Sequence, residues 1–237
     1  MNKVKQIGNT YKINDTIYSV GPTSLSYNYF KYFINDKNLK NILDIGCGNG
    51  ILLKLLNKKI AYLGVDSDAG IYKKKKHKKI KYFNNSLNCE KYLTNLDKKF
   101  DCVVLFEVLE HTDTFLKLFS IALKKSKKYV LVSLPNEDYL LSRIRFLFGK
   151  GLMTHGLEMI NYKPGHKHMW FIQFEKALEL LKKTAKKKKF GHLQTMFYVT
   201  QPRSFIKRVI YKFFLLIIPK HIKMNGFCLI FCKNNSK

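Results

Sequence analysis

Apolar and polar positions form two kinds of pattern along the chain, and these patterns predict its strands and helices. Short runs that are apolar throughout are typical of buried strands, whereas longer runs with an apolar stripe are typical of helices. The predicted strands are Asn41–Ile45, Tyr62–Val65, Ile80–Phe83, Cys102–Phe106, Tyr129–Ser133, Met196–Thr200 and Gly226–Cys232. The predicted helices are Ile51–Leu56, Asp113–Lys125 and Gln173–Lys183. Strands that alternate with helices favour an α/β fold with a mostly parallel sheet.

Two long segments interrupt this alternation. Asn136–Trp170 separates the fifth predicted strand from the next helix, and Gln201–Asn225 separates the last two strands. Insertions of this length after sheet strands are usually lids or binding loops. We therefore expect a single domain over residues 1–237, with a lid-like insertion at 136–170 and a hydrophobic insertion at 201–225.

The charge of the chain first suggests an anionic partner. The 237 residues include 44 Lys and Arg against 16 Asp and Glu, which gives a formal net charge of +28. Only four of the cations are arginines, namely Arg143, Arg145, Arg203 and Arg208. Phosphate and base recognition favour the planar guanidinium, so this composition argues against nucleic acid as a partner. The lysine runs at residues 73–79 and 182–189 are interpreted as solvated helix ends and turns.

The cysteines and the apolar stretches indicate in which cellular compartment the protein is found. Five cysteines without a CxxC pair argue against a zinc site or a disulfide framework, and the start of the sequence lacks the apolar run of a signal peptide. We therefore predict a cytoplasmic protein. The most apolar stretch, Phe213–Ile218, is far shorter than the ~20 residues that cross a bilayer. The segment Phe205–Ile218 has two interpretations: contact with a membrane interface, or a helix that covers a sheet edge or a dimer contact.

The most informative stretch is LDIGCGNG at Leu43–Gly50, which follows a strand and precedes a helix. Its glycines allow a sharp turn and a close approach of the backbone to a ligand. The dehydrogenase pattern GxGxxG does not fit, because Ile51 stands where the third glycine is required. The spacing is instead GxGxG, with Asp44 two residues before Gly46.

A second acid lies at the matching place one strand later. Asp66 closes the second predicted strand, 18 residues after Gly48, which is close to the distance at which a carboxylate accepts hydrogen bonds from ribose hydroxyls. In open α/β sheets ligands bind outside the carboxyl ends of the strands. The alternative is that Asp44 and Asp66 are ordinary turn or cap residues.

With these motifs the sequence resembles the class I S-adenosylmethionine-dependent methyltransferases. The matching stretches are LDIGCGNG, GVDSD, FDCVVLFEVLEHTD and VSLPN, which occur in the family's order. The resemblance implies a Rossmann-like, seven-stranded sheet with helices on both faces, and a cofactor whose methionyl part and ribose are held by the glycine loop and Asp66. The implied cofactor-binding residues are Asp44, Gly46, Cys47, Gly48, Gly50, Asp66, Ser67, Ser86, Phe106 and Glu107.

One position departs from the family pattern. The third strand of these enzymes ends in an acid that contacts the adenine, and alignment of IKYFNNSL places Ser86 there, beside Asn85. Serine and asparagine accept that hydrogen bond without a charge. We therefore expect the same mode of binding with reduced affinity.

The stretch EVLEH places Glu107, Glu110 and His111 just after the fourth strand. Two acids and a histidine are able to ligate a divalent metal. In the ubiquinone-biosynthesis O-methyltransferases, which this stretch resembles, the corresponding side chains have been linked to a metal ion. The alternative, which we favour, is that Glu110 and His111 anchor a turn and no metal is bound.

Candidates for a catalytic base lie in the first insertion, at His155, His166 and His168. A histidine that precedes xxF often borders the acceptor pocket in this family, and His168–Phe171 fits that pattern. Packing of a structural histidine beside Trp170 is the alternative. Imidazole titrates near neutral pH, so His168 and His111 are the candidate catalytic residues.

The sequence therefore predicts a methyltransferase that acts on a small molecule, at a hydroxyl oxygen of a quinone precursor, a sugar or a lipid-linked glycan. One alternative is an RNA methyltransferase, although no RNA-binding module and no NPPY-type motif is present. Another is a non-catalytic subunit that binds the cofactor. The acceptor and the oligomeric state stay open.

Overall fold

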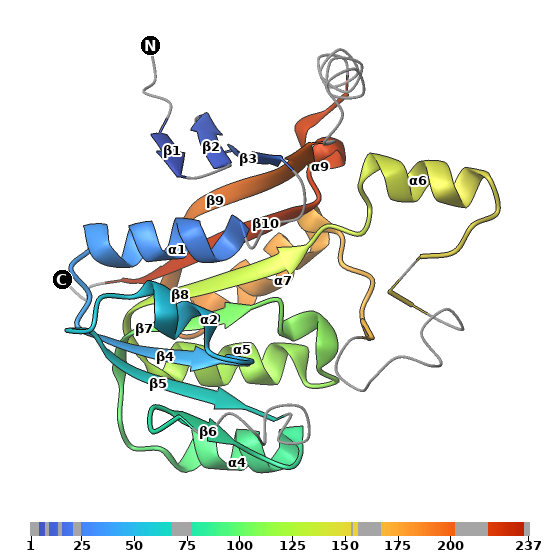
Figure 1. Cartoon of the computed structure of the whole chain (residues 1–237). Helices are drawn as coiled ribbons and strands as arrows, with labels where there is room; N and C mark the ends of the chain where they lie inside the picture. The colour runs from blue at the N-terminus through green and yellow to red at the C-terminus, as the bar shows by residue number, and fades with distance from the viewer. Residues whose placement is uncertain are drawn as a thin grey trace.

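The computed structural model contains one continuous sheet of ten strands in the order β1-β2-β3-β9-β10-β8-β7-β4-β5-β6 (Figure 1). The structure describes residues 5–7, 10–13, 16–20, 25–67, 77–152, 154–155, 167–201 and 218–234. The candidate His166 and most of the predicted hydrophobic insertion at 201–225 lie outside the described residues.

The strands are β1 Lys5–Ile7, β2 Thr10–Ile13, β3 Thr16–Val20, β4 Asn41–Ile45, β5 Ala61–Asp66, β6 Ile80–Tyr82, β7 Phe100–Phe106, β8 Ser126–Pro135, β9 Phe190–Gln201 and β10 Gly226–Lys233. The helices are α1 Leu25–Asp36, α2 Ile51–Leu55, α4 Ser86–Asn95, the 3-10 turn η1 Leu109–His111, α5 Phe115–Lys125, α6 Leu140–Leu147, α7 Phe174–Lys186 and α9 Lys220–Lys223. All seven predicted strands are present, with boundaries that differ by a few residues.

The core of the sheet is parallel, as predicted. β4 pairs in parallel with β5 and β7, β5 with β6, and β7 with β8, whereas β10 runs antiparallel between β8 and β9. All seven positions of β7 are buried, which is expected for a central parallel strand covered on both faces. Because the parallel strands end at one edge, the loops after β4, β5, β7 and β8 meet there.

Helices cover both faces of the sheet, as predicted. One apolar cluster joins α4, α5 and α7 to side chains such as Val103 and Leu105 of β7. The other joins α1 and α2 to the alternate side chains Cys102 and Val104. This alternation follows from the period of two in a strand, which sends successive side chains to opposite faces.

Three N-terminal strands extend the sheet beyond the expected seven. β3 pairs in parallel with β9, and β2 and β1 follow as an antiparallel meander. Each of these strands has three to five residues, which is too short for an apolar rhythm to stand out in the sequence. β3 is placed by its pairing with β9, a contact between distant segments that no local pattern encodes, and β2 and β1 follow from β3.

The described parts of the first predicted insertion include α6, which Figure 1 shows beyond the end of β8. Its function as a lid stays a prediction. Among the described residues, every helix is too short or too polar to cross a membrane.

Candidate active site

The glycine loop connects β4 to α2 through three left-handed backbone positions. Gly46, Gly48 and Gly50 have φ angles of 71°, 52° and 75°, which residues other than glycine rarely adopt. The N–H groups of Gly46 and Cys47 both donate to the carbonyl of Val65, at 2.8 and 3.2 Å. The loop is therefore fastened to the end of β5.

Packing also requires glycine at the first of these positions. A Cβ added to Gly46 would lie 2.3 Å from Cγ2 of Val108, far inside van der Waals contact. The loop thus lies directly against the turn that follows β7.

Asp66 faces this loop. Its side chain is buried, and its Oδ2 accepts a hydrogen bond of 2.7 Å from the backbone N–H of Gly48. From the adjacent strand β6, the hydroxyl of Tyr82 donates to the carbonyl of Gly48 at 3.1 Å. The structure therefore brings the glycine loop and the strand-end acid together, an arrangement that fits an adenosyl cofactor.

Asp44 is buried at the end of β4, where its Oδ2 accepts a hydrogen bond of 2.5 Å from the hydroxyl of Tyr62. Burial raises the pKa of Asp44 to about 7, although the bond from Tyr62 opposes this shift. The sequence analysis did not identify Tyr62, which fixes this carboxyl group from the adjacent strand.

The other predicted cofactor residues lie along the same edge of the sheet. Ser67 follows β5 and is exposed. Ser86 is the exposed first residue of α4, and Asn85 caps that helix because its Oδ1 accepts a hydrogen bond from the N–H of Asn88. The ring of Phe106 stacks on Phe30 of α1, so this side chain belongs to the core. A role of its backbone in cofactor binding stays a prediction.

The turn after β7 collects two carboxyl groups. Glu107 has a left-handed backbone, with φ 49°, and its carboxyl group accepts a hydrogen bond from the buried hydroxyl of Ser133. Glu110 is completely buried, and neither of its carboxylate oxygens has a hydrogen-bond partner within the described part of the chain. Removal from water raises the pKa of both carboxyl groups, and their proximity raises that of Glu110 further.

The two predicted catalytic histidines meet beside Glu110. The centroids of the His111 and His168 rings lie 4.8 Å apart in an edge-to-face arrangement. Nδ1 of His111 also lies 3.1 Å from the carbonyl oxygen of Lys167, 56 positions later in the sequence. The N–H of Met169 donates to the carbonyl of Glu110 at 2.8 Å. The segment that carries His168 is therefore fastened to the turn after β7.

Glu137 organises this cluster, and the sequence analysis did not identify it. Its Oε1 lies 2.6 Å from Nδ1 of His168 and 2.7 Å from Nε2 of His155, and its Oε2 accepts a bond of 2.7 Å from the N–H of Ile172. Burial alone would raise the pKa of Glu137, but the hydrogen bonds from His168, Ile172 and His155 outweigh it and lower the pKa. Its place directly after the SLPN motif, at the carboxyl end of β8, was the available signal.

The same side chains offer ligands for a cation. One ligand atom each of Glu110, His111 and His168 lies within 4.8 Å of the others, and the same holds for Glu137, His155 and His168. A buried carboxylate that accepts no hydrogen bond among the described residues, together with two imidazoles, is a donor set that suits a divalent transition metal. Of the set suggested by the sequence, the structure keeps Glu110 and His111 and adds His168.

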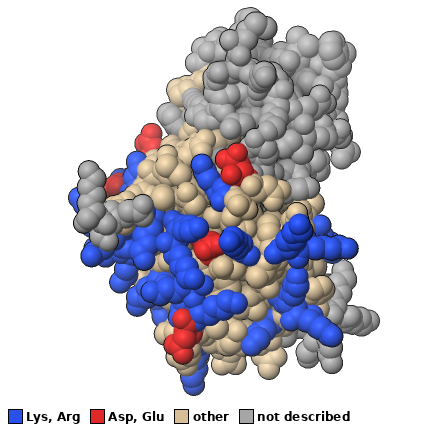
Figure 2. Space-filling view, turned by 90° about the vertical axis from the view of Figure 1, so that its left-hand side faces the viewer, with Lys and Arg blue, Asp and Glu red and all other residues tan. Residues whose placement is uncertain are grey.

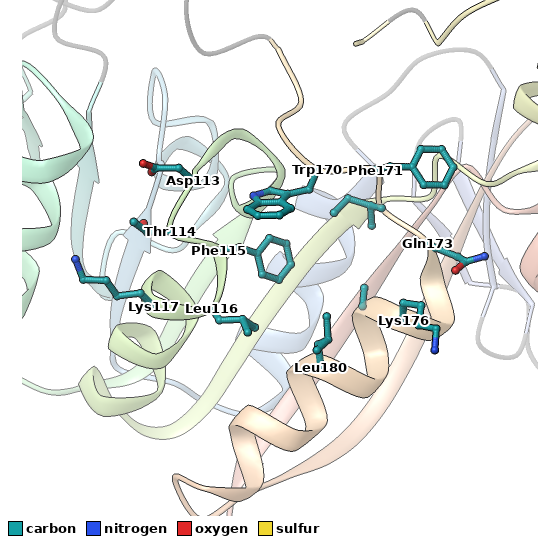
Figure 3. Close-up of a pocket in the computed structure, with 12 residues that line it drawn as sticks. Asp113, Thr114, Phe115, Leu116, Lys117, Trp170, Phe171, Gln173, Lys176 and Leu180 are labelled. Carbon is teal, nitrogen blue, oxygen red and sulfur yellow. The ribbon is translucent and has the colours of Figure 1, made fainter. Parts of the chain in front are cut away.

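A cavity of about 400 Å³ lies next to this cluster, between the first turns of α5 and α7 (Figure 3). Trp170 and Phe115 form its upper part in that view, and Leu116 and Leu180 lie lower. The indole N–H of Trp170 donates to the carbonyl of Thr112 at 2.6 Å, which holds the ring over α5. His168 and Trp170 are thus positioned by separate hydrogen bonds.

Comparison with known proteins agrees with this geometry. A family model described as a methyltransferase domain matches residues 27–184, about two thirds of the chain. Comparison with curated proteins found no match.

Three solved structures illustrate the fold. A SAM-dependent methyltransferase from Archaeoglobus fulgidus has 22% identity and a TM-score of 0.56 over 87% of this chain and 94% of its own. The methyltransferase domain of bacterial CtHen1-C has 18% identity and a TM-score of 0.58 over 88% and 97%. Magnesium protoporphyrin IX methyltransferase from Synechocystis PCC 6803, with bound SAH, has 16% identity and a TM-score of 0.52 over 88% and 82%.

The family match, the strand order and the glycine loop with its facing carboxylate lead to one assignment. This chain belongs to the methyltransferase-domain family and is a class I methyltransferase that uses S-adenosylmethionine.

Proposed function

We propose that the enzyme methylates a hydroxyl oxygen of a small molecule, and that the acceptor binds beside His111 and His168. The observation that carries this proposal is the cluster of imidazoles and carboxylates at the carboxyl ends of β7 and β8. It lies on the same sheet edge as the glycine loop, and Val108 connects the two. A neighbouring base activates a hydroxyl acceptor by removing its proton, whereas a more nucleophilic acceptor needs no such base.

His168 is the proposed proton acceptor. When Nδ1–H of His168 donates to Glu137, Nε2 keeps its lone pair and can take the proton of the acceptor hydroxyl. Bound S-adenosylmethionine supplies a methyl group that is already attached to a sulfonium leaving group. The contribution of the protein is then to orient the acceptor, exclude water and hold this proton.

The acceptor class is tested with isotopically labelled cofactor and cell extracts. We expect the label in small molecules, identified by mass spectrometry, to exceed greatly the label in total RNA. Predominant labelling of RNA would instead support the RNA methyltransferase alternative. A protein that binds the cofactor but labels neither fraction would be the non-catalytic subunit.

A cation at Glu110 is the second candidate feature, and it is favoured by the buried carboxylate, which accepts no hydrogen bond within the described part of the chain. The ion would be held by Glu110, His111 and His168, and its chemistry would be to lower the pKa of a bound hydroxyl. Metal-dependent transfer predicts that EDTA abolishes turnover and that Mg²⁺ or Mn²⁺ restores it. Full activity in EDTA would leave His168 as the proton acceptor without a metal.

Replacement of Asp66 tests the cofactor site. We expect Asp66→Ala to weaken S-adenosylmethionine binding about tenfold or more, because the variant loses a charged acceptor for the ribose and the bond that holds Gly48. Calorimetry measures the affinity, and Asp97→Ala, which removes an exposed acid at the opposite edge, is the matched control. Equal affinities of the two variants would remove the ribose role of Asp66.

A further inference from the structure

The glycine loop and the histidines lie at the carboxyl ends of the parallel strands. The amino ends of these strands form the opposite edge of the sheet. The loops before these strands, the ends of α5 and α7, and the end of β10 meet at this edge. Figure 2, which views the molecule from the left of Figure 1, shows lysines spread over this face. The lysines of this edge are Lys37, Lys40, Lys58, Lys59, Lys78, Lys79, Lys98, Lys99, Lys124, Lys125, Lys127, Lys128, Lys186, Lys187, Lys188, Lys189 and Lys233.

The edge at the carboxyl ends is different. Its described segments, at residues 46–50, 83–85, 107–114, 136–152, 154–155, 167–173 and 218–225, contain six cations, namely Arg143, Arg145, Lys150, Lys167, Lys220 and Lys223. A uniform excess of lysine in the composition would load both edges alike. The cations of the described residues are therefore distributed unevenly, with seventeen lysines at the amino edge and six cations at the cofactor and acceptor edge.

These charges are largely unneutralised. Within the described part of the chain the lysines of the amino edge make one ion pair, between Lys37 and Asp36 at 3.8 Å. Like charges held close together repel one another, and a bound polyanion relieves that repulsion and releases counterions.

The edge also contains a recess. A cavity of about 410 Å³ opens between the end of α5, the start of β9 and the end of β10. Five lysines line it, namely Lys99, Lys124, Lys125, Lys188 and Lys233, together with one acid, Asp97. Lys125 donates to the carbonyls of Thr94 and Leu96, which fixes one wall. The apolar residues of the lining, Leu96, Leu123 and Phe190, are not exposed.

We propose that this amino edge binds the phosphate backbone of nucleic acid without sequence preference. Lysine makes point-charge contacts to phosphates, and the described part of this edge contains no arginine, whose planar guanidinium favours bidentate contacts to guanine. A recess lined by cations accepts a protruding phosphate chain, whereas a planar lipid surface would reach only its rim. Composition alone argues against nucleic acid as a partner, but the grouping of lysines from seven separate segments is visible only in the fold.

The proposed surface is separate from the acceptor site. β7 connects the two edges, and its seven residues span about 20 Å at ~3.3 Å per residue. The nucleotides held in the recess therefore lie outside the acceptor site.

The test measures binding of a fluorescently labelled 20-nucleotide RNA by anisotropy at several salt concentrations. The variant Lys99→Gln/Lys124→Gln/Lys188→Gln removes three cations from the recess. The control Lys54→Gln/Lys91→Gln/Lys176→Gln removes three exposed cations elsewhere and changes the net charge equally. We expect the recess variant to bind at least about tenfold more weakly and to lose about three units of salt slope, with the control near wild type.

Three results would overturn the proposal: equal losses in the two variants, no RNA binding by the wild type at 100 mM salt, or tighter binding to phosphatidylglycerol vesicles than to RNA. Retention of S-adenosylmethionine affinity in both variants verifies that they are folded. The outcome is independent of the acceptor proposed above.

Discussion

Replacement of His168 by alanine is expected to lower turnover by about 10²–10⁴-fold, the usual contribution of a positioned base. The reason is the geometry of the cluster, in which Glu137 holds Nδ1 at 2.6 Å and the ring faces His111. The assay uses the acceptor that the labelling experiment identifies. Cofactor affinity should be unchanged, because His168 lies outside the glycine loop.

Two further variants separate chemistry from structure in this prediction. Glu137→Gln keeps an acceptor for the bond from His168 but removes the charge, so we expect an intermediate loss of turnover. His77→Ala removes an exposed histidine before β6 and should retain full activity. If His168→Ala keeps turnover within a few-fold of wild type, the acceptor site lies elsewhere.

Replacement of Gly46 by alanine is expected to destabilise the fold by about 2–5 kcal/mol and to weaken cofactor binding severely. The left-handed backbone costs about 1–2 kcal/mol for a residue with a Cβ. Overpacking against Val108, whose Cγ2 would lie 2.3 Å away, adds about 1–3 kcal/mol. Denaturant unfolding measures the stability, and calorimetry measures the affinity.

The chain provides a matched control for each part of this prediction. Gly149 has a similar φ of 67°, but a Cβ there meets no atom within 4 Å, so Gly149→Ala incurs the backbone cost alone. The double variant Gly46→Ala/Val108→Ala relieves most of the clash and should recover part of the stability. Equal destabilisation by Gly46→Ala and Gly149→Ala would show that the contact with Val108 is unimportant.

Proximity in sequence decided which parts of the site were predictable. The glycine loop is contiguous, and its glycines, Asp44 and the following helix form one local pattern. Asp66 was found because a strand–helix–strand unit has a nearly fixed length. Glu137 was missed because its partners His155 and His168 lie 18 and 31 residues away, across an insertion with no periodic pattern.

The sequence by itself determined the positions of the central strands along the chain, the glycine loop and Asp66, because short-range backbone geometry and hydrophobic periodicity encode them. The class of cofactor followed from the resemblance of these motifs to a known family. Tertiary structure alone decided that β1–β3 extend the sheet, that Glu110 is buried beside His111 and His168 and accepts no hydrogen bond from the described residues, and that the lysines gather at the amino edge. These features depend on strand pairing and on contacts between distant segments, and the free energy of such contacts comes from burial and charge in three dimensions.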